Sequence, residues 1–444
     1  SKKKDRGWTI SREGEEVGED GRTAIEESAI GDGARERIAR RPDGYGPMVS
    51  GPPAYRDEES EEMELLASFR VRTVFPGDVL KETEVLPEDP QESDFAGRTD
   101  LRGKTIFTID GADAKDYDDA IQIEEKGDGN VEIGVHIADV AHYVQPGTAL
   151  DTEALARATS CYLPDQVVPM LPEKLSNGLC SLVPDRPRLA YSVFMLFNEK
   201  GDRLDARVEK TVIQSCKRNT YRAVQELLDG EDTEDAKAIK HLEPDLRLFE
   251  KWARTSQSKR ERKGAMRIQS TEKKFVFDKK GEVEKIVDAP RYFSMSLIEE
   301  TALAANQAVG DLFRKRGLPT IYRVHPEKDP EEIEAVAASL DEHGIRVPKK
   351  ERLTGRDISQ LIRAARRKAN AEALIQRIMG LVERAVYEVR DHEDVATHFG
   401  LAKEAYLHFT SPIRRYPDLL VHRWAWAIES RALEAERELK TEDL

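Results

Sequence analysis

Residues 108–120 read Thr-Ile-Asp-Gly-Ala-Asp-Ala-Lys-Asp-Tyr-Asp-Asp-Ala, and they hold the densest chemistry of the chain. The aspartates of this stretch follow an apolar segment, residues 106–109, which is typical of a strand. Five aspartates fall within ten residues: Asp110, Asp113, Asp116, Asp118 and Asp119. Two carboxylates held about 4 Å apart repel each other by roughly 4 kcal/mol at an effective dielectric constant near 20. A folded loop of this composition therefore needs a nearby cation or carboxyl groups with raised pKa values.

The side-chain types in this cluster favour a hard divalent cation. Carboxylate oxygens without histidine or cysteine suit Mg²⁺ or Mn²⁺. Such clusters can hold two ions about 3.5–4 Å apart, the arrangement that serves in-line attack on phosphodiesters. The alternative is a solvated acidic turn, the usual explanation of a charge run. The spacing excludes an EF-hand loop and gives no support to a phosphatase-type aspartyl nucleophile.

A second stretch, residues 408–423, reads His-Phe-Thr-Ser-Pro-Ile-Arg-Arg-Tyr-Pro-Asp-Leu-Leu-Val-His-Arg. Arginine suits phosphate because its planar fork donates two parallel charge-assisted hydrogen bonds. The alternative is a helix N-terminus, with Ser411 as N-cap, Pro412 at the first helical position, and Arg414 and Arg415 in solvent. That alternative explains the Ser-Pro pair, but the helix dipole disfavours two positive charges in a first turn.

Hydrophobic periodicity predicts a mixed α/β fold. Strands are expected over residues 131–137, 190–197, 207–214 and 267–278. Helices are expected over residues 23–41, 294–313 and 371–390, and from Asp329, where Asp-Pro-Glu-Glu is typical of a capped start. We expect one large domain over residues 66–430, preceded by a small N-terminal accessory module or linker (residues 1–65) and followed by a helical tail (residues 431–444).

Composition sets wider limits. The chain has 444 residues, 70 Lys and Arg against 85 Asp and Glu, and a net charge of −15. No run of about 18 apolar residues is present, so we expect no membrane span. The N-terminus lacks the apolar region of a secretory signal, and three cysteines cannot form a disulfide framework, so we expect a cytoplasmic protein. An acidic protein can still bind nucleic acid through a locally basic channel.

Together, the motifs resemble the catalytic domain of the ribonuclease II / ribonuclease R (RNB) family. They occur in the family's order: residues 108–120, 135–144, 162–172, 175–182, 322–325 and 408–423. The resemblance covers about residues 66–426. It implies a processive 3′-to-5′ exoribonuclease that hydrolyses single-stranded RNA to nucleoside 5′-monophosphates by a two-metal mechanism with Mg²⁺, for which Mn²⁺ can substitute. It also implies RNA as the partner, and we expect a monomer.

The resemblance assigns roles at the reacting phosphate by motif position. Arg414 would neutralise the charge that builds on the scissile phosphate. Tyr162 would stack on the 3′-terminal base, although a tyrosine beside such a Pro-punctuated segment is more often part of a core. The carboxylates that would hold the metal and the attacking water are Asp110, Asp116, Asp118 and Asp119.

The resemblance also suggests RNA contacts farther along a channel. Tyr221, Glu300 (or Glu299) and Arg415 would contact RNA, with a possible role in reading the 2′-hydroxyl group. Two basic tracts, residues 251–267 and 363–368, could line the path of the RNA, or could be solvated helix faces.

The flanking segments depart from the family pattern. Family members usually carry two oligonucleotide-binding barrels before the catalytic domain and an S1 barrel after it. Residues 1–65 are too few for two barrels, so a winged-helix-like module is one option there. The residues after Arg423 leave no room for an S1 barrel, and we expect none within this sequence.

Two rival functions remain open at this point. A non-catalytic RNA-binding protein on the same scaffold would be expected to lack a metal ligand, and none of the four aspartates is missing. An endonuclease or a DNA-directed nuclease would differ in the size and sugar of its products.

Overall fold

The structure is a computed structural model that describes residues 60–266, 273–278, 283–326, 328–350, 353–391, 397–401 and 403–442. The chain forms two compact units. The larger comprises Pro87–Tyr143, Asn177–Glu272 and Ala289–Leu444, and the smaller comprises Ser1–Leu86, Val144–Ser176 and Lys273–Asp288. The helix predicted over residues 23–41 lies outside the described residues, as does most of the N-terminal module.

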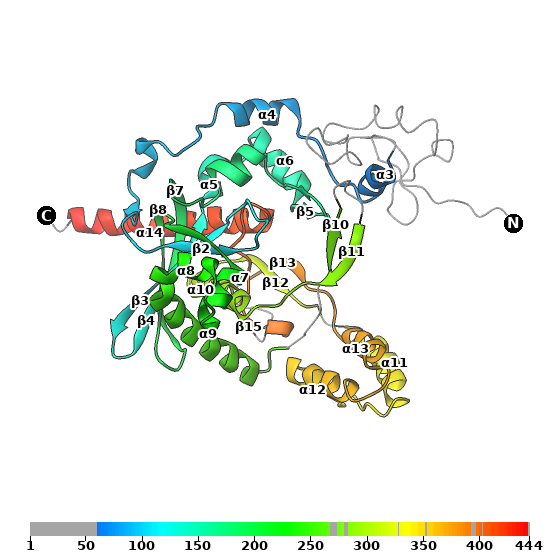
Figure 1. The fold of residues 1–444 in the computed structure, drawn as a ribbon. Coiled ribbons are helices and arrows are strands. Elements are labelled where there is room, and N and C mark those ends of the chain that lie inside the picture. Colours follow the sequence, from blue (N-terminus) through cyan, green and yellow to red (C-terminus); the bar gives the residue numbers. More distant parts are fainter. Residues whose placement is uncertain are drawn as a thin grey trace. The chain divides into compact units, whose positions relative to one another are not determined.

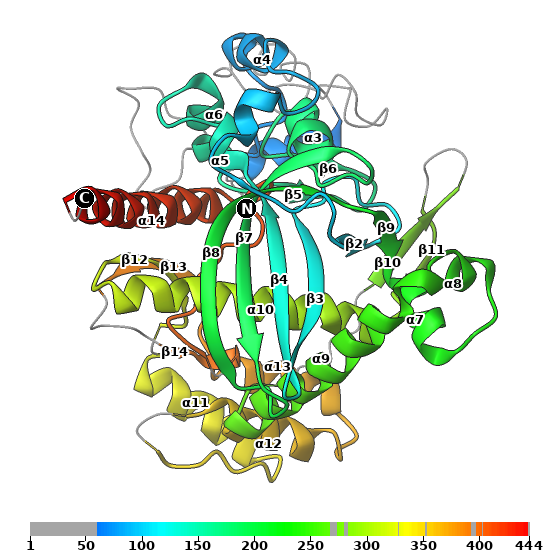
Figure 2. The same cartoon turned by 90° about the vertical axis from the view of Figure 1, so that its left-hand side faces the viewer.

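A seven-stranded sheet is the centre of the larger unit, with the strand order β1-β8-β7-β4-β3-β2-β9 (Figure 2). Its strands are β1 (Thr99–Asp100), β2 (Phe107–Asp110), β3 (Asp119–Gly127), β4 (Asn130–Ala138), β7 (Pro187–Phe197), β8 (Arg203–Gln214) and β9 (Lys217–Thr220). Strands β2, β3, β4, β7 and β8 are antiparallel neighbours, whereas the edge strands β1 and β9 pair in parallel with β8 and β2. The strands predicted over residues 131–137, 190–197 and 207–214 are confirmed.

Helices pack against the sheet and close its core. These are α7 (Tyr221–Asp229), α9 (Glu243–Lys263) and α10 (Phe293–Lys315), with the short elements α8 (Glu234–Ala238) and η4 (Lys240–Leu242) between the first two. Figure 2 shows α10 passing behind β7 and β4. Strand β7 is buried along almost its whole length, as its continuous apolar run predicts. The mixed helix-and-strand fold class is therefore confirmed.

Two of the expected helices are present in full. Helix α10 contains the helix predicted over residues 294–313. Helix α11 (Pro330–Asp341) begins after Asp329, whose side chain accepts a hydrogen bond from Glu331 N, with Pro330 at the first position. The cap signals in the sequence therefore located this helix start correctly.

The helix predicted over residues 371–390 is wrong in its second half. Helix α13 (Ala371–Met379) ends at Gly380, and residues Val386–Arg390 form strand β13, which pairs with β12 (Thr320–Val324). Valine and tyrosine near the centre of β13 favour a strand, and β12 supplies the hydrogen-bonding partner that the sequence does not reveal. Helices α11, α12 (Gly355–Ala365) and α13 share a separate apolar core.

The last helix, α14 (Tyr416–Glu442), continues past residue 430 without a break in its backbone. Short elements of the larger unit are η2 (Glu92–Phe95), α5 (Val140–Tyr143), β14 (Thr397–His398), η5 (Phe399–Leu401) and β15 (Lys403–Glu404). Among the described residues, no helix is both long enough and apolar enough to cross a membrane.

The smaller unit has its own small core around Met63, Leu66 and Val168. Its elements are α3 (Glu61–Ser68), α4 (Gly77–Glu84), α6 (Ala149–Arg157), β5 (Cys161–Tyr162), β6 (Val167–Val168), β10 (Lys273–Phe277) and β11 (Val283–Asp288), all marked in Figure 1 or Figure 2. Strand β10 confirms the second half of the strand predicted over residues 267–278, and the first half lies outside the described residues.

Candidate active site

The acidic residues lie where β2 ends and its antiparallel neighbour β3 begins. Asp110 is the last residue of β2, and Asp119 is the first residue of β3. The connecting loop carries Asp116 and the buried Asp118, whereas Asp113 is exposed. Strand pairing thus brings the two ends of the acidic stretch together.

The loop between these strands is held from outside by Arg218 on β9. One guanidinium nitrogen of Arg218 donates to the carbonyl oxygens of Gly111 and Ala112, each at 2.7 Å. On the other side, Tyr117 N donates to Ser181 Oγ at 2.9 Å. These contacts fix a loop whose negative charges would otherwise push it open.

Asp118 is the most deeply placed carboxylate of the cluster, with 4% of its surface exposed. Its Oδ1 accepts a hydrogen bond from Ile413 N at 2.9 Å, a contact between residues 295 positions apart. Its Oδ2 lies 3.7 Å from Arg414 Nε. The two stretches that the sequence singles out therefore meet at Asp118.

Burial makes the charged form of each carboxylate costly. It raises the pKa of Asp110 to about 7, helped by the charge of Asp119. It raises the pKa of Asp119 to about 6, although Arg414 and Arg415 oppose the change. The pKa of Asp118 lies well above its ordinary value for the same reason, and that of Asp116 is also raised by burial. Full ionisation of the cluster therefore needs more positive charge than these arginines provide.

The arginine pair lies on a tight turn that precedes α14. Arg415 N donates to Ser411 O at 3.0 Å, and α14 itself begins only at Tyr416. The alternative of a helix that begins at Ser411 is therefore wrong. Asp418, fully buried in the first turn of α14, accepts hydrogen bonds from Ser411 N and from Arg415 Nη2, each at 2.8 Å. That carboxylate ties both ends of the turn together.

Asp418 and Arg218 are the residues that the sequence interpretation missed. Asp418 is part of the Pro-Asp pair within residues 408–423, but the sequence does not reveal that it bonds to Ser411 and Arg415. Nothing in the sequence around Arg218 separates it from an ordinary strand residue, because its acceptors lie more than a hundred positions away.

Tyr221 belongs to the same neighbourhood. It is the first residue of α7, and it is half-buried. Burial raises its pKa, and the charges of Asp119 and Asp110 add to the increase. The larger unit thus brings together Asp110, Asp116, Asp118, Asp119, Arg414, Arg415 and Tyr221.

Glu300 is placed differently from these residues. It lies on α10 with 4% of its surface exposed, and Arg260 of α9 donates to it at 2.6 Å. Arg260 also donates to the more exposed Glu299 at 2.9 Å. A buried carboxylate engaged in this way holds α9 and α10 together, so of the two glutamates Glu299 is the more accessible.

Tyr162 belongs to the smaller unit, on the short strand β5, which pairs with β6. Its side chain is 54% exposed. The alternative that it is a core residue is therefore wrong, and its role at the RNA end stays a prediction.

The carboxylate oxygens of the acidic cluster are the type of ligand that a hard divalent cation prefers. Asp110 Oδ2 and Asp118 Oδ2 are buried and have no hydrogen-bond donor among the described residues. Buried acceptors without a donor are costly, and a divalent cation is an ordinary way to satisfy them. No three of the described His, Cys, Asp and Glu side chains are already grouped closely enough to enclose an ion. The carboxylates would therefore have to turn towards a cation to bind it.

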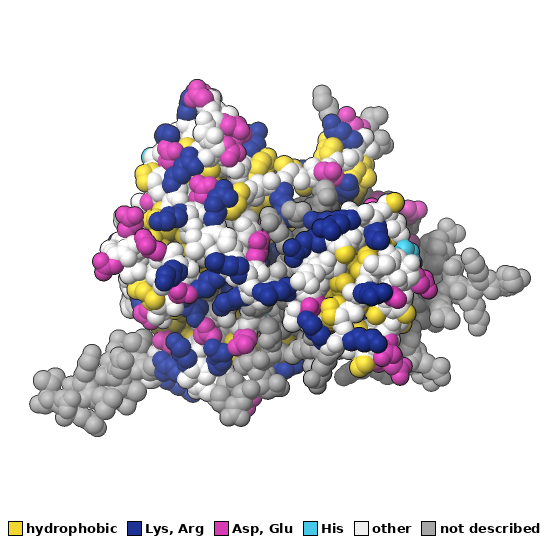
Figure 3. Space-filling view, turned by 90° about the horizontal axis from the view of Figure 1, so that it is seen from below, with side chains coloured by type: hydrophobic (Ala, Val, Ile, Leu, Met, Phe, Trp, Pro, Cys, Tyr) yellow, Lys and Arg dark blue, Asp and Glu magenta, His cyan; other side chains and the backbone are white. Residues whose placement is uncertain are grey.

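The two basic tracts have different surroundings. In the first, Arg254, Lys259 and Arg260 are paired with carboxylates. The exposed cations at the end of α9, on α12 and directly after α12 have no carboxylate partner among the described residues: Arg262, Lys263, Arg363, Arg366, Arg367 and Lys368. Arg356 joins the two helices by donating to Arg262 O at 2.6 Å. Figure 3 views the protein from the side on which α9 and α12 lie in Figure 1, and Lys and Arg gather there.

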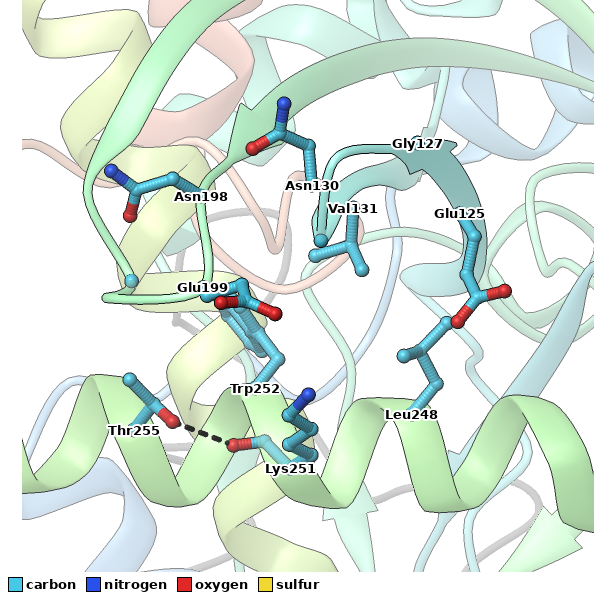
Figure 4. A pocket seen from close by; sticks show the side chains of 12 residues that line it. Glu125, Gly127, Asn130, Val131, Asn198, Glu199, Leu248, Lys251, Trp252 and Thr255 are labelled. Atoms are coloured by element: carbon cyan, nitrogen blue, oxygen red, sulfur yellow. Dashed lines mark hydrogen bonds between the residues drawn. The ribbon is translucent and has the colours of Figure 1, made fainter.

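A pocket of about 270 Å³ lies at the opposite end of the sheet from the aspartates. It is formed by the β3–β4 turn, the β7–β8 turn and α9, and its lining includes Glu125, Glu199, Lys251 and Trp252 (Figure 4). Asp119 and Glu125 are six positions apart along β3, which corresponds to about 20 Å. This pocket is therefore separate from the acidic cluster.

A family model for the RNB domain matches residues 98–430, about three quarters of the chain. The chain belongs to the RNB-domain family. The family inferred from the motifs is thereby confirmed, and the matched segment contains each of the aspartates, arginines and tyrosines considered above. RNB exoribonucleases are metal-dependent.

Curated relatives agree with this assignment. Ribonuclease R of Thermotoga maritima is 42% identical over 356 residues, 79% of this chain and 48% of that protein. Ribonuclease R of Escherichia coli is 37% identical over 361 residues, 81% of this chain and 43% of that protein. The chain thus spans about half the length of the curated relatives it matches.

Solved structures of Mycoplasma genitalium RNase R are similar in fold. One, in complex with ribose-methylated single-stranded RNA, has a TM-score of 0.74 at 27% identity, covering 82% of this chain and 56% of its own. Yeast Ssd1, described as a pseudonuclease, has a TM-score of 0.58 at 19% identity, covering 78% of this chain and 42% of its own. The second likeness shows the fold alone, so the side chains must decide whether this family member is catalytic.

Proposed function

We propose that this chain is the catalytic part of a 3′-to-5′ exoribonuclease that hydrolyses single-stranded RNA processively to nucleoside 5′-monophosphates. The observation that carries the proposal is the contact of Asp118 with Ile413 N and Arg414, which joins the acidic stretch to the arginine pair within an RNB domain. RNA as the partner follows from this proposal, and a cytoplasmic monomer is our expectation. The three cysteines are free thiols, as in proteins of reducing compartments.

Mg²⁺ would be held by the carboxylates of Asp110, Asp116, Asp118 and Asp119, with Mn²⁺ as a substitute. In a two-metal arrangement, the bound ions lower the pKa of a water molecule and neutralise charge on the phosphate. The buried acceptors Asp110 Oδ2 and Asp118 Oδ2 support this assignment, as do the raised pKa values of Asp110 and Asp119.

Arg414 is the residue best placed to act on the scissile phosphate. Its side chain is 43% exposed, and it lies at the edge of the cluster, 3.7 Å from Asp118. Its guanidinium can donate to a non-bridging oxygen, where negative charge grows during attack. Asp118, held by Ile413 N, is the fixed reference point for this geometry.

The remaining assignments concern the RNA beyond the scissile bond. We propose that Tyr162 stacks on the 3′-terminal base and that Tyr221 contacts the nucleotide near the acidic cluster. Arg415 would contribute its positive charge while bonded to Asp418. For Glu300, burial against Arg260 supports an indirect role, with Glu299 as the accessible carboxylate.

The test uses a 5′-labelled single-stranded RNA of about 30 nucleotides. It is incubated with Mg²⁺, with EDTA, and beside a DNA of the same sequence. Stepwise shortening to a small 5′-labelled end product, only for RNA and only with metal, is the expected result. Internal fragments would indicate an endonuclease, and equal loss of the DNA would refute the RNA preference.

The second candidate, an RNA-binding protein that does not cleave, is favoured only by the fold that the chain shares with a pseudonuclease. Binding of the labelled RNA without any shortening in Mg²⁺ or Mn²⁺ would support it.

We propose residues 66–430 as the catalytic domain. Because α14 crosses residue 430 as one helix, residues 431–442 extend its last element.

A further inference from the structure

Strands β12 and β13 form a two-stranded ribbon, and Arg323 and Tyr387 lie directly opposite each other on it. The guanidinium carbon of Arg323 lies 4.5 Å from the centre of the Tyr387 ring. Arg323 is half-buried in this position. The ring therefore fixes a positive charge that is only partly in contact with water.

The guanidinium of Arg323 makes no hydrogen bond or ion pair with any of the described residues, and it lies over the Tyr387 ring. A guanidinium has five N–H donors, and half-buried cations in proteins are usually paired with carboxylates. Two other half-buried arginines of the larger unit follow that rule, since Arg260 bonds to Glu300 and Arg415 bonds to Asp418. Arg323 is therefore available for an anion from outside the chain.

The loop that leads to the catalytic turn anchors this ribbon. Arg323 N donates to Tyr406 O at 2.8 Å, and the Tyr387 hydroxyl shares a hydrogen bond of 2.7 Å with His408 Nδ1. Three residues after His408 the chain reaches Ser411, where the turn with Arg414 begins. Residues 406–411 therefore connect the ribbon that carries Arg323 to the turn that carries Arg414 and Arg415.

Three guanidinium groups converge on this region. Burial lowers the pKa of His408 to about 2, and the charges of Arg415, Arg323 and Arg414 contribute to that decrease. Arg415 is bonded to Asp418 at 2.8 Å, and Arg414 lies 3.7 Å from Asp118. The residues on the same ribbon face as Arg323 carry no carboxylate: Ile321, Tyr387 and Val389. These residues therefore leave the positive charge of Arg323 uncompensated on its own face of the ribbon.

We propose that Arg323, with its guanidinium over the Tyr387 ring, binds a phosphodiester of the RNA next to the scissile one. An arginine fork matches two phosphate oxygens, and an aromatic neighbour with an exposed apolar residue is typical of surfaces that bind single strands. Val389 is 69% exposed on that face. This inference rests on the proposed function and adds a substrate contact that the sequence motifs did not assign.

The test measures RNA affinity at several salt concentrations in the Asp118→Asn protein, which should hold RNA without cleaving it. Adding Arg323→Gln removes the charge and keeps a planar polar side chain. We expect affinity to fall about tenfold, and the slope of log affinity against log salt to become shallower by about 0.7, the value for one phosphate contact on a single strand. Arg323→Lys keeps the charge and should keep the slope while losing part of the affinity.

Arg207→Gln is the matched control, because the Arg207 guanidinium also lies over an aromatic ring, that of Phe194 at 4.2 Å, but is already paired with Glu132 at 2.6 Å and with Glu209 at 2.7 Å. It should leave both affinity and slope unchanged. An unchanged salt slope in the Arg323→Gln protein would overturn the inference, as would an equal change in the control. Failure of the parent Asp118→Asn protein to bind RNA would instead refute the proposed function. Circular dichroism on each variant separates these results from misfolding.

Discussion

Replacing Asp418 by alanine tests whether the catalytic turn is held by one buried carboxylate. Asp418 has no exposed surface and accepts hydrogen bonds from Ser411 N and Arg415 Nη2, each at 2.8 Å. The Arg415 side chain is 21% exposed. In the Asp418→Ala protein a buried backbone N–H and a largely buried guanidinium lose their partner together.

The size of the effect follows from those two losses. Removing one member of a buried ion pair costs roughly 3–5 kcal/mol, because the other charge stays buried without compensation. An unsatisfied backbone donor contributes about 1–3 kcal/mol within that range. We therefore expect the free energy of unfolding of the larger unit to fall by about 3–5 kcal/mol. Asp418→Asn keeps an acceptor for Ser411 N and should lose about half as much.

Two measurements check this prediction. Urea unfolding followed by tryptophan fluorescence reports on α14 directly, because Trp424 and Trp426 lie on that helix. Amide hydrogen exchange should show faster exchange at Ile413, whose N–H bonds to Asp118 only while the turn is in place. Asp100→Asn is the control, since its pair with Arg102 is exposed and screened by solvent, so its loss should leave the stability almost unchanged. Equal stability of the Asp418→Ala and Asp100→Asn proteins would refute the reasoning.

Three further predictions concern the chemistry and the core. Asp118→Asn should abolish RNA cleavage while RNA binding, measured by filter retention, stays within a few-fold of the parent, and unchanged cleavage would contradict the metal assignment. Arg414→Ala should lower kcat by about 100-fold or more with little change in KM, as expected for a group that acts on transition-state charge, whereas a loss confined to KM would mean that it only positions RNA. Burial lowers the pKa of His136 and of His422 to about 3, against an ordinary value of 6.5. The unfolded chain therefore binds their protons first, and each histidine should lower the free energy of unfolding by about 1.4 kcal/mol per pH unit as the pH falls below about 6.5. Urea titrations from pH 7.5 to pH 5 would show this, and His136→Gln should reduce the slope.

Local sequence signals predicted the local structure. The apolar run of β7 and the alternation in β4 identified buried strands, and the Asp-Pro cap identified the start of α11. The prediction failed where a long-range partner decided the outcome, because residues 386–390 form a strand only when β12 lies beside them. Propensity alone cannot supply that partner.

In the candidate site, too, the sequence predicts what is local and misses what depends on long-range contacts and burial. The sequence shows that Asp110, Asp116, Asp118 and Asp119 are close along the chain, but not that burial raises their pKa values. The decisive hydrogen bond, from Ile413 N to Asp118, joins residues 295 positions apart. No spacing rule connects two such stretches, so only the resemblance to a family could bring them together before the structure did.

The adjacent arginines show most clearly what the fold adds to the sequence. Arg414 and Arg415 are chemically identical neighbours, and either could bind phosphate. In the folded chain, Arg415 is bonded to the buried Asp418, whereas Arg414 is 43% exposed and 3.7 Å from Asp118. A guanidinium bonded to a fully buried carboxylate gains less from an incoming phosphate than a more exposed one at the edge of the acidic cluster. The turn therefore gives the two residues different roles, and replacing Arg415 should change stability more than catalysis, while replacing Arg414 should do the reverse.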